Sequence, residues 1–162
     1  MQAQGQFTHE FKVAALNEAV GNTSSMDMGN IKLGLFSDVP TVGTNGAVSY
    51  TEIPGTSGGE STGYARVDVG IYNQSAACKF GSPTYDATTG ATVCKNNAEI
   101  HFNSVKKTWG AIKGFGLFRS SGTLIAFGTI NDAEGNAIEN GVTPEVGNIV
   151  FFKTGDVVLS MT

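Results

Sequence analysis

The two histidines are the residues of this sequence best suited to acid–base chemistry, because imidazole titrates close to neutral pH. His9 falls in the first turn of a predicted helix, and His101 falls on the outward face of a predicted strand beside Glu99. Nucleophilic catalysis needs a Ser, Cys or Asp partner held against such a base, and the sequence indicates none. No glycine-rich stretch carries the Lys-Ser/Thr pair of a phosphate-binding loop. We therefore predict a protein that is not an enzyme and that has no cofactor.

The two cysteines could be thiols or could form a disulfide. Cys78 and Cys94 flank the segment 79–93, which is rich in Gly, Ser, Thr and Pro, and with two distant histidines they match no zinc spacing. A cytosolic protein keeps its cysteines reduced, whereas a particle that works outside the cell can acquire a bridge. Closing a loop of this length would stabilise the fold by about 3 kcal/mol. Both states stay open at this point.

Oxygen-bearing side chains gather around Asp132 and could in principle coordinate calcium. The segment 131–136 reads NDAEGN, and Glu139 lies close by. This order does not match the ligand positions of an EF-hand. Asp, Asn and Gly are the usual residues of hairpin turns, so we predict a polar turn here and no metal site.

Charge and hydropathy exclude two classes of partner. The net charge is −4, and the densest basic spot is the pair Lys106 and Lys107, whereas nucleic-acid binding needs clustered cations. No apolar run approaches the roughly 20 residues of a membrane helix. The N-terminus has neither the basic nor the apolar region of a secretory signal. We predict synthesis in the cytoplasm, with no nucleic acid and no membrane as partner.

One segment, Thr8 to Val20, has the spacing of a helix. Thr8 is the predicted N-cap, Glu10 suits the first turn, and Gly21 ends the pattern. Apolar side chains fall on one side of this helix at Phe7, Phe11, Ala14, Ala15 and Ala19.

The remainder alternates between short apolar runs and glycine-rich turns, the pattern of strands. Strands are predicted at 31–36, 48–53, 64–72, 98–102, 109–119, 123–130, 142–146, 149–154 and 157–161. No helical pattern separates them, which favours a sandwich of antiparallel sheets. The runs 109–119 and 123–130 are joined by a short loop with a glycine at 122, so they are predicted to form a hairpin in the middle of a sheet, covered on both sides. We predict an N-terminal arm and helix over residues 1–21 and a single β-domain over residues 22–162.

The order of the motifs resembles a family of small tailed-phage virion proteins, some labelled tail-fibre-like and others capsid decoration or cement proteins. The motifs are IKLGLF at 31–36, GYAR at 63–66, WGAI at 109–112, FGLF at 115–118, LIAFG at 124–128, VGNIVF at 146–151 and TGDVVL at 154–159. The resemblance extends from Phe11 to Leu159, with an insertion at about 77–97. It implies a mainly β fold, an antiparallel β-sandwich of jelly-roll type with a short N-terminal helix, and a structural role.

Between the two roles found in that family, we predict a capsid decoration or cement subunit on the head surface of the virion. The reason is that the chain lacks the coiled-coil heptads or long β-repeats of a fibre shaft. Its predicted partners are the major capsid protein and further copies of itself. The alternative is a tail-fibre or tail-tip component that binds a receptor or carbohydrate through the aromatic residues Tyr72, Phe80 and Tyr85.

The residues predicted to matter for these roles are bulky or charged. Anchors of the core or of an interface are Trp109, Tyr64, Phe115 and Phe118. Candidate contact residues are Phe7, Phe11, Arg66 and Tyr85. The predicted contact surfaces are residues 1–20, the loop 41–63 and the cysteine-flanked loop.

Overall fold

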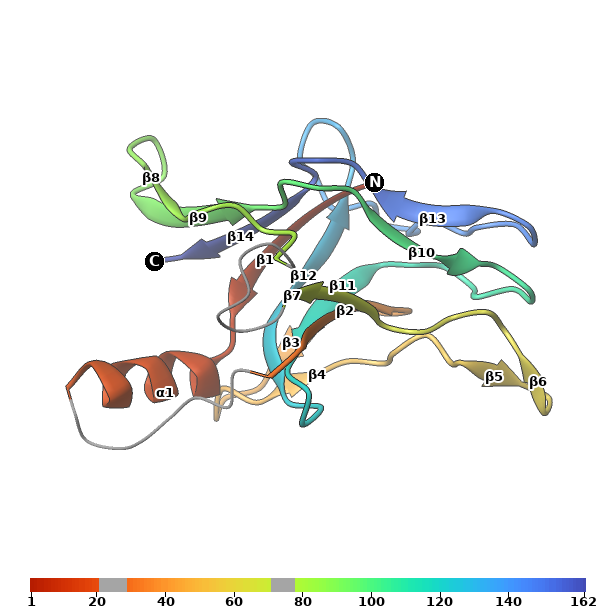
Figure 1. The fold of residues 1–162 in the computed structure, drawn as a ribbon, viewed down its shortest axis with the longest axis horizontal. Coiled ribbons are helices and arrows are strands. Elements are labelled where there is room, and N and C mark those ends of the chain that lie inside the picture. Colours follow the sequence, from red (N-terminus) through yellow and green to blue (C-terminus); the bar gives the residue numbers. More distant parts are fainter. Residues whose placement is uncertain (21–28, 71–77) are drawn as a thin grey trace.

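The structure is a computed structural model that describes residues 1–20, 29–70 and 78–162. In these residues it has one helix, α1 (His9–Ala19), and fourteen strands (Figure 1). The strands are β1 (Gln2–Phe7), β2 (Ile31–Phe36), β3 (Thr41–Val42), β4 (Val48–Ser49), β5 (Thr56–Ser57), β6 (Glu60–Ser61), β7 (Val67–Gly70), β8 (Thr84–Asp86), β9 (Ala91–Lys95), β10 (Ile100–Ser104), β11 (Gly114–Phe118), β12 (Leu124–Asn131), β13 (Ile149–Phe152) and β14 (Val157–Met161). The prediction of a mainly β fold with one short helix is confirmed.

Eight strands form one sheet in the order β7-β2-β11-β12-β1-β14-β9-β8. Every neighbouring pair is antiparallel except β1 and β14, which run parallel. The sheet is therefore mixed and not purely antiparallel, the one difference from the predicted pairing. The parallel pair arises because the strands at the two ends of the chain lie side by side, and parallel neighbours need a long connection, which here is almost the whole chain.

The sequence analysis did not predict β1, which lies inside the sheet. It pairs with β12 from Gln2 to Phe7 and with β14 on its other side. Two glycines allow this close packing, because a Cβ at Gly5 would lie 2.6 Å from a backbone oxygen of Phe127, and one at Gly128 would lie 1.8 Å from that of Gln4. Residues 2–7, which were predicted to be part of an arm, are thus built into the sheet.

The second layer is the antiparallel pair of β10 and β13, which covers one face of the large sheet. Its inward side chains, Ile100, Phe102, Val150 and Phe152, belong to the same buried cluster as the sheet residues. This packing of two β layers is consistent with a β-sandwich, with eight strands in one layer and two in the other. The sheet side of the cluster includes Leu33, Leu35, Val69, Phe115, Leu117, Ile130, Val157 and Leu159.

A smaller apolar cluster lies elsewhere against the sheet and contains Phe36, Phe118 and Phe127, all less than a tenth exposed. Tyr50, which follows β4, stacks on Phe36 with ring centroids 4.5 Å apart. With Phe115 in the main cluster, β11 is buried along its whole length. The predicted hairpin is present, and Gly122 (φ +87°) provides its turn. Its strand β11 is covered as predicted, whereas Gly128 and Thr129 of β12 are only half-buried.

Several predicted elements differ in extent. The predicted strand 142–146 is reduced to one bridge between Val142 and Ile112, and the predicted strand 48–53 is reduced to β4 with a bridge at Glu52. The strand predicted at 64–72 begins at Val67, and its end lies outside the described residues.

The insertion at about 77–97, predicted as a loop, contains the hairpin β8–β9. The predicted helix is confirmed within one residue at each end, and Thr8 caps it by accepting a hydrogen bond from the Phe11 N–H at 3.2 Å. In the described ranges no helix is long and apolar enough to cross a membrane.

Candidate functional site

Two residues of the GYAR motif bind the Glu52 side chain of the same chain. The Tyr64 hydroxyl donates to Glu52 Oε1 at 2.7 Å and accepts from the Leu35 N–H at 2.9 Å. Arg66 donates twice to the same carboxylate, at 2.8 and 2.6 Å, and its guanidinium lies 3.4 Å from the centre of the Phe118 ring. Burial raises the pKa of Tyr64 well above its usual value, and the bond to Glu52 raises the pKa of Arg66. Arg66, a predicted contact residue, is thus paired within its own chain.

The remaining predicted anchors are core residues. Trp109 is 3% exposed and its Nε1–H donates to the Thr62 carbonyl at 2.8 Å, while Phe115 and Phe118 are fully buried. Gly63 has φ +83°, and a Cβ there would lie 2.2 Å from a backbone oxygen of Ser104. These motif residues therefore serve the fold of this chain.

The predicted contact residues Phe7 and Phe11 pack against each other, and their stacked rings have centroids 4.7 Å apart. They line a small apolar hollow of about 170 Å³ together with Phe80, and the Arg119 guanidinium lies 5.8 Å from the Phe11 ring. Tyr85, by contrast, is 71% exposed on β8. Tyr72 lies outside the described residues.

Both cysteines are thiols in the structure. Cys78 donates its S–H to the Phe80 carbonyl at 3.4 Å, and Cys94 donates to the Gly81 carbonyl at 3.1 Å. Burial, with a smaller contribution from Cys78, raises the pKa of Cys94. The disulfide stays a prediction.

His101 lies in a half-exposed pair on the outer face of β10. Its Nε2 is 2.9 Å from Glu99 Oε2, and its ring stacks on Phe151 with centroids 5.3 Å apart. In the part of the chain that the structure describes, no three His, Cys, Asp or Glu side chains gather as metal ligands would. The predicted turn around Asp132 is present, with Oδ1 accepting from the Glu134 and Asn136 N–H groups.

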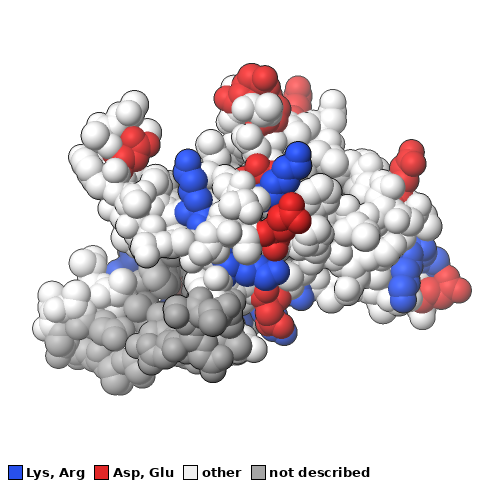
Figure 2. Space-filling model, turned by 45° about the horizontal axis from the view of Figure 1, so that its top comes forward, with Lys and Arg blue, Asp and Glu red and all other residues white. Residues whose placement is uncertain are grey.

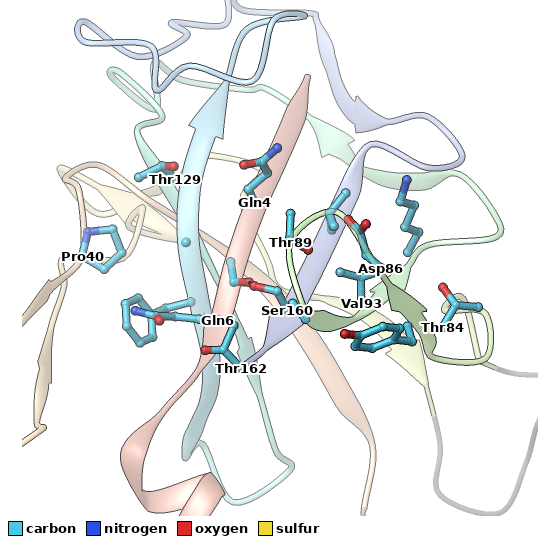
Figure 3. Close-up of a pocket in the computed structure, with 17 residues that line it drawn as sticks. Gln4, Gln6, Pro40, Thr84, Asp86, Thr89, Val93, Thr129, Ser160 and Thr162 are labelled. Atoms are coloured by element: carbon cyan, nitrogen blue, oxygen red, sulfur yellow. The ribbon is translucent and has the colours of Figure 1, made fainter.

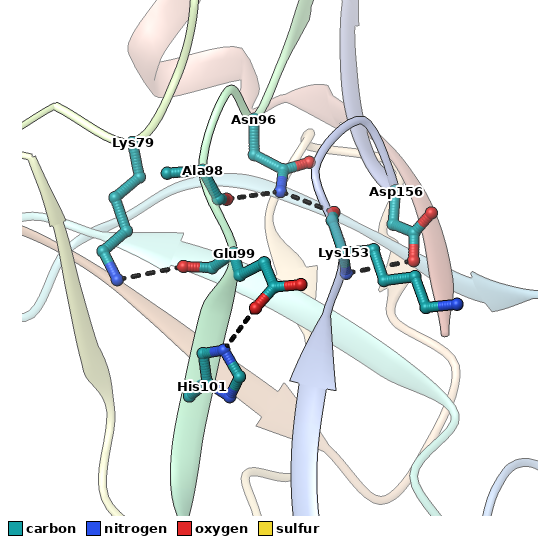
Figure 4. A network of polar contacts seen from close by, with 7 residues as sticks. All are labelled: Lys79, Asn96, Ala98, Glu99, His101, Lys153 and Asp156. Carbon is teal, nitrogen blue, oxygen red and sulfur yellow. Dashed lines mark hydrogen bonds and ion pairs between the residues drawn. The ribbon is translucent and has the colours of Figure 1, made fainter.

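Near the pair of His101 and Glu99, a buried asparagine joins two turns (Figure 4). Asn96 is 1% exposed, and its side-chain nitrogen donates to the carbonyls of Ala98 and Lys153, each at 2.8 Å. Its side-chain oxygen accepts from the Val157 N–H at 2.8 Å. Both polar atoms of this side chain are therefore hydrogen-bonded to backbone groups, so Asn96 is a structural residue.

A groove of about 960 Å³ lies on the face of β12, β1, β14, β9 and β8 away from the main core (Figure 3). Its lining mixes uncharged polar side chains, such as Gln4, Gln6 and Ser160, with apolar ones, such as Val93, Phe127 and Val158. The exposed Tyr85 also lines it. This polar groove is the candidate binding site of the molecule.

Sequence reasoning missed the groove because its walls come from five strands, and three of these, β1, β8 and β9, were not predicted. Gln2, Gln4 and Gln6 alternate with smaller residues, and this period of two is a strand signal that could have found β1. The register between β1 and β14, separated by most of the chain, is not visible in the sequence.

Charged residues do not form a large area of one sign on the face drawn in Figure 2, where blue and red atoms are interspersed. In the groove itself, the charged lining residues are Lys95 and Asp86, one of each sign. Hydrogen bonds within its own turn, chiefly from the Thr88 N–H, lower the pKa of Asp86. The groove therefore offers hydrogen bonds, apolar contacts and one exposed aromatic ring, with balanced formal charge.

A family described as podophage GP4 fiber I protein gp80 (Gp80) matches residues 6–160 of the chain. This match extends from β1 to β14 and includes nearly the whole described fold. No curated protein matches at a significant level.

Proposed function

The chain belongs to the family of the podophage GP4 fiber I protein gp80, and we propose from this membership that it is a subunit of a fibre on a tailed-phage particle. The match over residues 6–160 carries the proposal, because it includes both layers of the fold and, apart from residues 2–5 of β1 and the last residue of β14, the strands of the groove. At the least, this family membership makes the chain a fibre-like structural protein of a phage virion.

The sequence analysis predicted decoration of the capsid, with a fibre or tail-tip role as the alternative. The family description names a fibre and so favours that alternative. Decoration of the head surface, with the major capsid protein as partner, stays a prediction. It has one supporting observation, namely that the described part of the chain has only an eleven-residue helix and no shaft.

On the fibre proposal, the shaft comes from another protein or from the association of several copies. A compact β-subunit then forms a knob whose groove is turned outward, and no catalysis is involved. The predicted self-association remains part of this proposal, and light scattering on the purified full chain measures it. A monomer at micromolar concentration would remove self-association from the proposal and leave the fibre role intact.

Fab fragments raised against the purified protein test the role on intact particles. Because a fibre meets the cell before the head does, these fragments are expected to slow adsorption of the phage to its propagation strain. Fab fragments against the major capsid protein are the matched control and are expected to leave adsorption unchanged. If the first set coats the heads in many copies and adsorption stays normal, the fibre role is wrong and decoration replaces it.

A further inference from the structure

We propose that the polar groove binds an uncharged oligosaccharide of a bacterial surface glycan. The inference deepens the proposed function and rests on it, because a fibre subunit meets the glycans of the envelope first. It is argued below from the positions, the free hydrogen-bonding capacity and the charge of the lining side chains.

The register of the sheet places the lining side chains in two parallel rows. Residues at alternate positions of a strand lie on one face, about 7 Å apart, and neighbouring strands lie about 5 Å apart. Gln4 and Gln6 lie on β1, one in each row, and both point away from the main core (Figure 3). One row is Thr129, Gln4, Val158 and Lys95, and the other is Phe127, Gln6, Ser160, Val93 and Thr84. The result is two rows in which hydrogen-bonding side chains alternate with apolar ones, an arrangement that suits the mixed polar and C–H surface of a sugar.

The two glutamines are free to bind a ligand. Both side chains are exposed, and among the described residues neither carboxamide makes a hydrogen bond. Each carboxamide offers two donors and one acceptor, which is the combination that adjacent sugar hydroxyls require. The hydroxyls of Thr129 and Ser160 donate to Asn131 and to the Gly5 carbonyl, but they can still accept.

An aromatic ring completes the recognition of a sugar. Tyr85, on β8, combines an apolar face, suited to the C–H face of a pyranose, with a hydroxyl at its tip. It is 71% exposed, so a ligand contact would cover a ring that the fold leaves open. The groove, at about 960 Å³, lies at the upper end of the range of ligand sites, which suits several linked rings.

Other classes of ligand fit the groove less well. Nucleic acid needs several cations, and Lys95 is the only Lys or Arg in the lining. The centre of a subunit interface is enriched in apolar and aromatic side chains, whereas this groove places Gln, Thr and Ser between its Val and Phe residues. With one positive and one negative residue in the lining, a polyanionic glycan gains no net attraction. An uncharged oligosaccharide matches all of these features.

The test is binding of the full chain to a printed array of purified bacterial surface oligosaccharides, both uncharged and anionic. The wild type is expected to bind uncharged members, with an affinity that stays within about twofold between about 50 and about 500 mM NaCl, because no ion pair is involved. The double variant Gln4→Ala/Gln6→Ala is expected to bind about tenfold more weakly or worse. Tyr85→Ala is expected to lose about fivefold.

Gln2→Ala is the matched control, since Gln2 lies on the same strand but outside the groove lining. It is expected to bind within about twofold of the wild type, and thermal unfolding of each variant checks that the fold is intact. The proposal is overturned if no oligosaccharide binds, if the double variant binds like the control, or if binding falls steeply with salt. A change of oligomeric state in the double variant also overturns it, in favour of a contact between copies. Because the array uses purified protein, its outcome is separate from the adsorption test of the fibre role.

Discussion

Replacing the buried asparagine between the two turns is expected to cost a large part of the stability of the fold. The Asn96 side chain makes three hydrogen bonds to backbone groups, each 2.8 Å long. A hydrogen bond contributes about 1 kcal/mol net, and a buried partner left unpaired costs about 1–3 kcal/mol. Asn96→Ala should therefore lower the free energy of unfolding by about 3 kcal/mol. For a chain of this size that corresponds to a fall in melting temperature of about 6–12 °C.

Urea unfolding followed by tryptophan fluorescence measures this change directly. Trp109 is the single tryptophan and is buried, so its emission reports the loss of the core. The urea dependence of the free energy should stay the same while the midpoint falls, because the same surface is exposed on unfolding. Asn97→Ala is the matched control, since Asn97 is exposed and is expected to change stability by less than about 0.5 kcal/mol. If both variants unfold at the same urea concentration, the reasoning about this network is refuted.

Three further predictions use the same unfolding assay or intact mass. Gly63→Ala should lower the free energy of unfolding by about 3 kcal/mol or more, because the added Cβ clashes with backbone at a residue of positive φ. Gly59→Ala is the control, since Gly59 also has a positive φ but has open space around it, and it should lower the free energy of unfolding by about 1 kcal/mol. Alkylation of the unfolded protein should add two groups, and Cys94 should react slowly in the folded protein because burial raises its pKa; a mass lower by two hydrogens with no alkylation would instead show a bridge to Cys78. The folded-state pKa of Asp132 is lowered, so its contribution is present above the usual value of about 3.8 and is lost as the pH falls through the lower folded value. Asp132→Asn should flatten that part of the acid decline, and an unchanged decline would contradict the assignment.

Local signals were sufficient for much of the fold. Thr8 was predicted as an N-cap because capping depends on neighbours three residues away, and the structure has that bond. The strand 157–161 and the hairpin around Gly122 were predicted from alternation and turn residues, and they are present with those bounds or close to them.

Most of the missed features depend on contacts between distant parts of the chain, although the local hairpin β8–β9 was missed as well. β1 was missed because Gln and Gly are weak strand formers, and only pairing with β12 and β14 makes the segment a strand. Glu52, the partner of Arg66, comes from a loop 14 residues earlier, and nothing in the spacing indicates the pair. The groove has the same origin, since the strands that form it become neighbours only in the folded sheet.

The place of β1 also changes how the N-terminal surface is tested. Deleting residues 1–20 would remove an interior strand of the sheet and would unfold the domain whether or not the segment makes contacts. A substitution such as Leu16→Ser, at a residue 66% exposed on α1, leaves the sheet intact. Its effect on incorporation into particles would therefore report on contacts alone.

The central claim is that this chain is a fibre subunit, and a cryo-electron microscopy reconstruction of the intact particle tests it most directly. The eight-stranded sheet with the two-stranded layer against it is a recognisable shape to fit into density (Figure 1). We expect the fold in a few copies on an appendage, with the face that carries Gln4 and Gln6 turned away from the particle. The same fold repeated in many copies over the head would contradict the claim and identify a capsid decoration protein.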